Sequence, residues 1–419
     1  MSSTDTVTGH DRSTLTELAT SLDRDDPLAH HRDAFVQRDD VRAYLDGNSL
    51  GRPLHATRDS LASFVDDVWG ARLIRAWDEG WMDAPTELGD RIGRVVLGAA
   101  AGQTVVADST TVMLYKLVRA AVDHAPAGRD EVVADTENFP TDRFVLEGIA
   151  AERGVTLRWI TPGPDGVTAD AVEAAVGDRT ALVLLSQVDY RSGRLTDLPA
   201  VTRVAHDAGA LVLWDVCHSA GSVEITLDAH EVDLAVGCTY KYLNGGPGAP
   251  AFGYVAKRLQ SRLAQPVQGW MGSADPFAMG ESYVAADGVR RFLSGTPPIV
   301  GMLAMRDMLD LVEHAGMPAV RAKSIALTTF AIDVHDALLA PLGVSLATPR
   351  DPALRGSHVT LEHPDFRRVV AELWTRGVIP DFRPPQGLRV GLSPLSTSFA
   401  EVLDGLAEVA SVLQEQQQA

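Results

Sequence analysis

Lysine is the first residue type to examine for chemistry, because its amine can form an imine with an aldehyde. The chain has 37 lysines and arginines, of which only four are lysines. Lys116 and Lys323 fall in helical patterns and Lys257 follows a strand pattern, so we expect these three to be solvated surface charges. Lys241 differs, because an apolar run precedes it and the glycine-rich segment YLNGGPGAP follows it. Lys241 is therefore the candidate nucleophile.

A carboxylate accompanies this lysine. Asp215 lies 26 residues before Lys241, at the end of the apolar run ALVLWDV, and His218 follows it at a D-x-x-H spacing. A strand-terminal carboxylate suits the protonated ring nitrogen of pyridoxal phosphate (PLP), and a strand-end lysine suits its aldehyde. Asp215 alone could equally cap a helix. The three residues together are more specific, and they predict a PLP site.

Further side chains could contact such a cofactor. Hydroxyl residues 109–111 open a helical pattern, where free backbone N–H groups favour a phosphate; an ordinary capped helix is the alternative. An aromatic side chain could stack on the ring, and nearby polar groups could hydrogen bond to it, although each could also be structural. These candidates are Phe139, Asp142, Ser186 and Tyr240.

The elements that must position these residues can be read from the pattern. Between residues 131 and 255, short β-rich runs alternate with helical runs, which predicts an α/β fold with a mostly parallel sheet and helices on both faces. Ligands of such sheets bind beyond the carboxyl ends of the strands. After Pro297 and Pro298 the pattern predicts a smaller α+β domain. We expect an N-terminal segment at 1–60, a large domain at 61–297 and a small C-terminal domain at 298–419.

Composition narrows the possible partners. The formal net charge is −19 and no basic run occurs, so nucleic acid and anionic membranes are poor partners and a small-molecule substrate is favoured. We expect no metal site. Two cysteines and a polar N-terminus predict a reducing, cytoplasmic location. We expect no apolar stretch near the roughly 20 residues that span a bilayer.

Several motifs together resemble the kynureninase family of PLP enzymes, which have fold type I, the aspartate-aminotransferase-like fold. The run YKYLNGGPGAPAF is the most specific of them. The other matching segments are LDGNSLG (45–51), LIRAWDEGW (73–81), ENFPTDR (137–143), VDYRSG (188–193), WDVCHSAG (214–221), GWMG (269–272), GTPPI (295–299) and LRVGLSPL (388–395).

The resemblance implies roles for individual residues. Lys241 would hold PLP as a Schiff base and Asp215 would pair with the ring nitrogen. Arg389 would bind the substrate α-carboxylate, a bidentate task suited to guanidinium. Tyr240 and His218 would act in proton handling and in positioning the substrate ketone. The remaining contacts implied are Thr110, Thr111, Phe139, Pro140, Thr141, Asp142, Ser186, Trp270 and Thr296 for the cofactor, and Ser49 and Trp77 for the substrate.

The resemblance also implies an assembly and a reaction. Trp270 and Thr296 match positions contributed by a neighbouring subunit, so a homodimer with interfacial active sites is expected. The implied reaction is hydrolysis of L-kynurenine, or of 3-hydroxy-L-kynurenine, to an anthranilate and L-alanine in tryptophan degradation. Met113 departs from the family pattern, because many relatives have Asn there.

Three alternatives remain beside this reaction. An aminotransferase would share the residue chemistry but lacks the motif match. A cysteine desulfurase needs a nucleophilic cysteine after the lysine, and no cysteine follows Cys238. A PLP-binding protein without chemistry is disfavoured by the joint presence of Lys241, Asp215 and Arg389.

Overall fold

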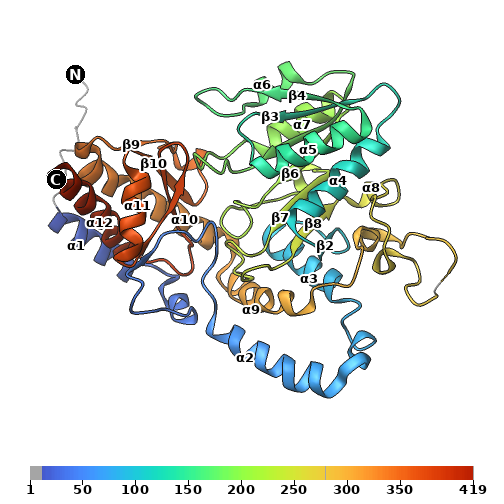
Figure 1. Ribbon diagram of the computed structural model, residues 1–419, viewed down its shortest axis with the longest axis horizontal. Coiled ribbons are helices and arrows are strands. Elements are labelled where there is room, and N and C mark those ends of the chain that lie inside the picture. Colours follow the sequence, from blue (N-terminus) through green and yellow to red (C-terminus); the bar gives the residue numbers. More distant parts are fainter. Residues whose placement is uncertain (1–11, 279, 419) are drawn as a thin grey trace. The chain divides into compact units, whose positions relative to one another are not determined.

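The computed structural model describes residues 12–278 and 280–418, which group into two compact units (Figure 1). The large unit comprises residues 50–190 and 194–318. The small unit comprises, among the described residues, 12–49, 191–193 and 319–418. The chain therefore passes between the units four times.

The expected domain limits need correction at both ends of the large unit. It begins at Leu50 rather than at residue 61, and it continues to Pro318 rather than to residue 297. The reason for the later end is helix α9 (Ile299–Ala315), which packs against α2 (His55–Ser63) and α3 (Ala84–Ile92) of the same unit. A proline pair marks the start of α9 but not the end of the domain.

The large unit is built on a seven-stranded sheet in the order β2-β8-β7-β6-β5-β3-β4. Strand β8 alone runs antiparallel to its neighbours, so the prediction of a mostly parallel sheet is confirmed. Three of the strands, β2, β7 and β8, are buried along their whole length, and β3, β5 and β6 are buried except at one end residue, which explains their largely apolar sequences. The strands are β2 (Thr104–Ala107), β3 (Glu131–Asp135), β4 (Thr156–Ile160), β5 (Thr180–Ser186), β6 (Leu211–Asp215), β7 (Leu234–Cys238) and β8 (Ala251–Val255).

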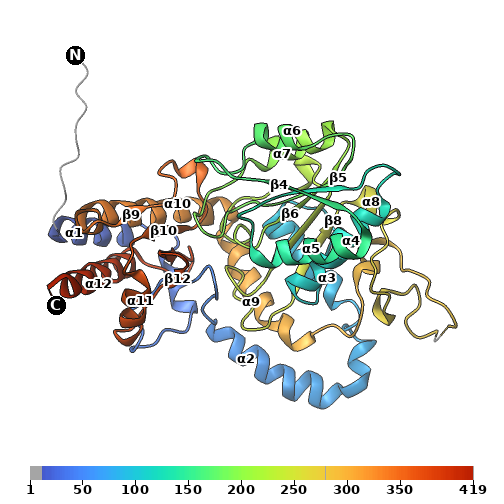
Figure 2. The ribbon, with the colours of Figure 1, turned by 45° about the horizontal axis from the view of Figure 1, so that its top comes forward.

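Helices cover both faces of this sheet. In Figure 2, α6 and α7 lie on one side of the strands, and α4 and α5 lie on the other. Three of these helices begin at a side-chain cap: Ser109, Thr168 and Asp197 each accept a backbone N–H of the first turn. The bounds of these four helices are α4 (Thr110–His124), α5 (Pro140–Arg153), α6 (Ala169–Ala175) and α7 (Leu198–Asp207). A short helix, α8 (Lys257–Gln260), follows β8.

Short helical turns complete the large unit. They are π-helical at Phe64–Gly70 and Gly93–Leu97, and of the 3-10 type at Leu73–Trp77, Asp228–His230, Trp270–Gly272 and Gly288–Phe292. The segment after α2 exposes large apolar side chains: Val65 is 50%, Trp69 53%, Leu73 57% and Ile74 76% exposed. These four side chains are called the apolar patch below.

The small unit is an α+β domain, as predicted. Its four-stranded antiparallel sheet has the order β12-β13-β10-β9, and β1 pairs with β11 in parallel. The elements are α1 (Arg12–Arg24), β1 (Ala43–Tyr44), α10 (Met317–Val334), β9 (Ser345–Leu346), β10 (His358–Glu362), α11 (Phe366–Thr375), β11 (Val378–Ile379), β12 (Asp381–Arg383), β13 (Gly387–Gly391) and α12 (Phe399–Gln418), with short helical turns at Ala29–Ala34, His335–Leu339, Ala340–Leu342 and Pro352–Leu354.

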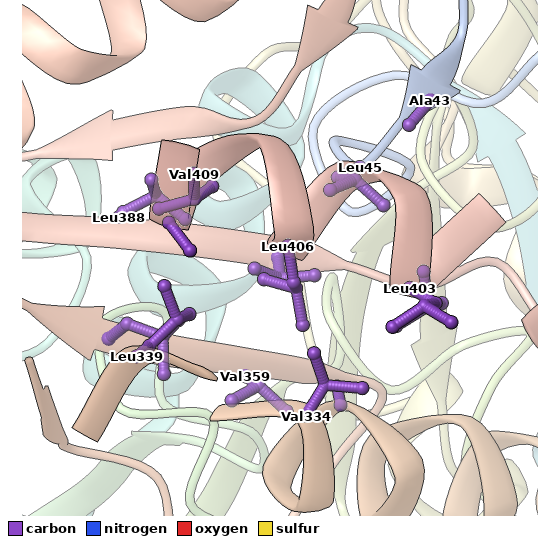
Figure 3. Close-up of a cluster of buried hydrophobic side chains, with 14 of the residues drawn as sticks. Ala43, Leu45, Val334, Leu339, Val359, Leu388, Leu403, Leu406 and Val409 are labelled. Carbon is purple, nitrogen blue, oxygen red and sulfur yellow. The ribbon is translucent and has the colours of Figure 1, made fainter. Parts of the chain in front are cut away.

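The core of the small unit joins segments that are distant in sequence. Leu45 follows β1, Val334 ends α10, Val359 lies on β10 and Leu406 lies on α12, and Figure 3 shows their side chains gathered in one cluster. All four are fully buried. The N-terminal segment is thus part of this unit's core.

One apolar helical run corrects an expectation. Residues Met317–Leu342 form 26 residues of continuous helix that are apolar enough to cross a membrane by length and composition. The expectation that no stretch approaches this length was therefore wrong. The run is apolar because it supplies Leu327, Phe330 and Val334 to the core of the small unit.

Candidate active site

Two of the lysines expected at the surface are buried, which corrects the sequence interpretation. Lys116 is 0% and Lys323 is 6% exposed. Each amine lies 2.6 Å from a carboxylate oxygen, of Asp108 and Asp26 respectively. A local helical pattern cannot show such pairing, because the aspartates lie outside each helix. Lys257 is exposed, as expected.

Lys241 lines a cavity of about 140 Å³ at the carboxyl ends of the parallel strands. Asp215 and Ser186, the last residues of β6 and β5, lie in the same wall. The cavity brings together ten of the predicted site residues: Thr110, Thr111, Phe139, Thr141, Asp142, Ser186, Asp215, His218, Tyr240 and Lys241. Three lining residues were not predicted: Val188, Tyr190 and Cys217. Val188 and Tyr190 belong to the motif VDYRSG, but neither residue type by itself indicates a cofactor contact.

The lysine amine faces two aromatic rings. Its Nζ lies 5.9 Å from the ring centroid of Phe139 and 5.9 Å from that of Tyr240. The ring of Phe139 is held in an edge-to-face contact with Tyr190, at 5.3 Å and 86°. An aromatic ring with its other face towards the cavity can stack on a planar cofactor.

The loop that carries Lys241 is held by the segment at residues 51 and 52. The N–H of Gly51 donates to the carbonyl of Tyr240 at 2.8 Å, and Nδ2 of Asn244 donates to the carbonyl of Arg52 at 2.7 Å. A Cβ at Gly51 would lie 2.4 Å from the Lys241 carbonyl oxygen. Gly51, the last residue of LDGNSLG, is therefore a glycine because the lysine loop approaches it closely.

Three buried carboxyl groups surround the strand ends. Burial raises the pKa of Asp142 well above its ordinary value, and the negative charge of Asp215 raises it further. Burial also raises the pKa of Asp135 to about 7, helped by the charge of Asp189. A protonated Asp142 can donate to Asp215, whose Oδ1 also accepts the N–H of Cys217 at 2.7 Å. A carboxylate held in this way can pair with the ring nitrogen of PLP.

Asn138 is a buried residue next to the site whose contacts the sequence interpretation missed. It is 3% exposed, and its Oδ1 accepts the Ser186 hydroxyl at 2.7 Å and the Phe139 N–H at 2.8 Å. It therefore ties the ring that faces the lysine to the hydroxyl at the end of β5. Its place in ENFPTDR was noted only as part of the motif.

The N-terminus of α4 opens onto the cavity. Thr110 and Thr111 line the cavity wall with the first-turn N–H groups of this helix, which have no intrahelical partner. Such a helix start attracts a phosphate group.

Met113, where many relatives are expected to have Asn, is fully buried, and a Cβ at Gly253 would lie 2.6 Å from its sulfur. Met113 therefore packs against β8.

The Cys217 thiol and the Tyr240 phenol both keep their protons near neutral pH, because the pKa of each is raised. A hydrogen bond with Cys238 and burial raise the pKa of Cys217 well above its ordinary value. Burial raises the pKa of Tyr240, and the nearby Cys238 adds to the effect. Cys217 is therefore an inert thiol and Tyr240 a phenol that can donate a proton.

Arg389 and Ser49 are brought together in the small unit. Arg389 is 1% exposed and its Nη2 donates to the Ser49 hydroxyl at 2.8 Å. The same nitrogen lies 2.7 Å from Oδ2 of Asp381, and the Nε of Arg389 lies 2.9 Å from the amide oxygen of Asn48. A buried guanidinium fixed on several sides is pre-oriented for a carboxylate.

Besides Arg389 and Ser49, four predicted site residues do not line the cavity of this chain. Trp77 and Trp270 contact each other edge-to-face at 5.8 Å, and Trp270 also contacts Phe277 at 6.1 Å. Thr296 is exposed. Pro140 opens α5 between two residues that do line the cavity.

The cavity fits PLP in its set of functional groups. It offers an amine for the aldehyde, a carboxylate for the ring nitrogen, an aromatic ring for stacking and a helix N-terminus for the phosphate. The buried Oδ2 of Asp142 receives no N–H or hydroxyl donor among the described residues, so a polar group of a ligand can satisfy it.

Sequence relatives agree with this chemistry. The chain is 41% identical over 404 residues to a kynureninase of Burkholderia pseudomallei (strain K96243), which covers 95% of each chain. It is 40% identical over 400 residues to a kynureninase of Pseudomonas fluorescens, covering 94% of each. Residues 320–409 match the family described as kynureninase C-terminal domain, and residues 96–290 match the family described as Cys/Met metabolism PLP-dependent enzyme.

Solved structures agree on the fold. A cysteine desulfurase from Thermococcus onnurineus superimposes with a TM-score of 0.78 at 18% identity, covering 94% of this chain and 98% of that chain. The cysteine desulfurase CsdA from Escherichia coli gives 0.79 at 17% identity, covering 93% and 98%. At this identity the likeness shows the fold type I architecture alone. Identity to kynureninases over nearly the whole length shows more: this chain belongs to the kynureninase family of PLP-dependent enzymes.

Proposed function

We propose that this enzyme hydrolyses the Cβ–Cγ bond of L-kynurenine to give anthranilate and L-alanine. The observation that carries the proposal is the amine of Lys241 in a cavity wall shared with Asp215 and facing the ring of Phe139. The name carried by the relatives at 40–41% identity supplies the substrate class.

The residues that would hold PLP follow from the cavity. Thr110, Thr111 and the α4 N-terminus would bind the phosphate, Phe139 would stack on the ring and Asp215 would keep the ring nitrogen protonated. When bound, PLP supplies an electron sink for the negative charge that develops next to the amine-bearing carbon of the substrate.

The chain's own residues then move protons. Lys241 is the base for the proton on the substrate α-carbon, because its amine lies in the wall of the cavity that would hold the substrate. The phenol of Tyr240 is the donor for the β-carbon once its bond to the acyl group is broken, since its raised pKa keeps the proton in place until then. His218, which also lines the cavity, would orient the ketone that water attacks.

Substrate recognition would fall to the remaining predicted residues. Arg389, already oriented by Ser49 and Asp381, would bind the α-carboxylate. Trp77 would contact the substrate, and Trp270 and Thr296 would contact the cofactor in a neighbouring subunit.

The Lys241→Ala variant tests the proposal. Wild-type enzyme supplied with PLP and L-kynurenine, without a keto acid, should release equal amounts of fluorescent anthranilate and of alanine. The variant should release neither and should lack the visible absorbance of lysine-bound PLP. Turnover by the variant, or wild-type release of alanine only when a keto acid is added, would overturn the assignment.

The preferred ring of the substrate needs its own measurement. L-kynurenine and 3-hydroxy-L-kynurenine differ by one hydroxyl, and a polar residue such as Thr296 could accept either. The ratio of kcat/KM for the two substrates decides which is preferred.

We propose a homodimer as the working assembly. The apolar patch exposes Trp69 and Ile74, and such a surface favours a protein partner. A complementation experiment tests the sharing of sites. Lys241→Ala and Thr296→Ala chains, mixed under conditions that exchange subunits, should recover activity if one chain supplies Thr296 to the lysine site of the other. A monomer at assay concentration would refute the dimer.

A cytoplasmic location is also proposed. Cys217 and Cys238 are both buried and unbridged, as expected in a reducing compartment. Detection of the protein in the cytosolic fraction of its source cells would support this location, and export would refute it.

A further inference from the structure

The link between β2 and α4 has an unusual backbone. It consists of Asp108 and Ser109, and it leads directly to the two threonines that line the cavity. Asp108 has a φ of 53°, in the left-handed region that non-glycine residues seldom adopt. Its carbonyl accepts the N–H of Ala251 at 3.0 Å, which fixes the end of the strand. The backbone must therefore be held in a strained turn before α4 begins.

A buried lysine reaches back to this turn. Lys116 lies six residues after Thr110 on α4 and is 0% exposed, while the side chain of Asp108 is 25% exposed. The two side chains are 2.6 Å apart. Burial lowers the pKa of Lys116, and the charge and the hydrogen bond of Asp108 oppose that effect. A buried ion pair is a poor source of net stability, which suggests that it serves another purpose here.

We propose that Lys116 is a positioning residue for the cofactor: its ion pair with Asp108 holds the strained β2–α4 turn so that Thr110, Thr111 and the α4 N-terminus face the PLP phosphate. Lys116 itself does not line the cavity. It acts through Asp108, because the turn and the helix start are joined by Ser109 alone.

The chain contains a matched control. Lys323 and Asp26 in the small unit form a second buried Lys–Asp pair, also at 2.6 Å, with side chains 5% and 2% exposed. Neither residue lines the cavity. Removing this pair removes the same kind of interaction without touching the phosphate turn.

The experiment compares Lys116→Met with Lys323→Met. The dissociation constant of PLP, measured by titrating the apoenzyme, should rise about 5- to 100-fold in Lys116→Met, the range that corresponds to releasing one strained residue. The ³¹P NMR shift of the bound phosphate should change as well. Lys323→Met should lower the melting temperature yet leave both readouts at the wild-type values. Equal PLP affinity and equal ³¹P shift in the two variants would overturn the proposal.

A second pair of variants isolates the backbone and does not depend on Lys116→Met being folded. Asp108→Ala and Asp108→Gly both remove the carboxylate, but only glycine adopts a φ near 53° without strain. Asp108→Gly should bind PLP more tightly than Asp108→Ala, and its ³¹P shift should lie closer to that of the wild type. Identical values for both would refute the role of the turn. These readouts do not involve kynurenine, so they stand apart from the test of the reaction.

Discussion

The buried carboxyl group of Asp135 should make the stability of the folded protein depend on pH, because its pKa is raised on folding. Asp135 ends β3, is 6% exposed, and has a pKa raised from 3.8 to about 7. The folded protein thus disfavours the ionised form, whereas the unfolded chain ionises freely. Stability is lost as pH rises from about 4 towards 7, because the unfolded state releases its proton first.

The size of the destabilisation follows from the change in the pKa of Asp135 between the unfolded and the folded state. At 1.36 kcal/mol per unit, Asp135 destabilises the fold by about 4 kcal/mol at pH 8 and by about 1.7 kcal/mol at pH 5. Asp135→Asn keeps the shape and the oxygen that accepts the Glu137 N–H at 3.0 Å, and it removes the charge. The variant should therefore be more stable than the wild type, by about 2.5 kcal/mol more at pH 8 than at pH 5.

Thermal unfolding of the PLP-loaded enzyme at the two pH values provides the assay. The gain in melting temperature of Asp135→Asn should be larger at pH 8 by several degrees, of order 2–5 °C for a unit of this size. Asp165→Asn is the control, because the Asp165 side chain is 86% exposed and its loss should shift the melting temperature equally at both pH values. A gain for Asp135→Asn that is equal at both pH values, or larger at pH 5, would refute the reasoning.

Three further outcomes are expected. Phe139→Leu should weaken PLP binding about 2- to 10-fold in an apoenzyme titration, because it removes the ring that faces Lys241; unchanged affinity would contradict stacking. Arg389→Lys should lower kcat/KM about 10- to 100-fold while PLP binding is retained, since lysine cannot make the paired hydrogen bonds; an unchanged kcat/KM would remove Arg389 from substrate binding. Gly51→Ala should shift the absorbance of lysine-bound PLP and slow turnover, because the new Cβ would lie 2.4 Å from the Lys241 carbonyl oxygen. Gly148→Ala, with no atom within 4 Å of the new Cβ, should leave both unchanged, and equal effects of the two variants would refute the steric explanation.

The parts of the site carried by strand ends could be predicted from the sequence. Asp215 ends β6 and Ser186 ends β5, and parallel strands bring their carboxyl ends to one edge, so an apolar run followed by a polar residue was enough to place both. Lys241 was placed by the same reasoning with the glycines that follow it.

The parts that depend on contacts between distant segments could not be predicted. Lys116 and Lys323 have ordinary helical surroundings in sequence, and only their pairing with Asp108 and Asp26 explains their burial. The end of the large unit was missed for the same reason, since α9 begins directly after the proline pair and packs on α2 of the large unit. The hydrogen bonds that Asn138 accepts from Ser186 and Phe139 could not be predicted either, because asparagine occurs in many turns without a function.

The N-terminal segment of the small unit has a consequence for synthesis on the ribosome. Asp23, at the end of α1, accepts the backbone N–H groups of Phe399 and Ala400 at 3.0 and 2.9 Å, and the first of these contacts spans 376 residues. At about 5–20 residues per second, α1 waits roughly 20–75 s for the helix on which it packs. Leu15 and Ala19, buried in the finished protein, have no native partner from α12 during that time. The large unit can fold first, and α12, which is synthesised long after α1, then completes the core of the small unit.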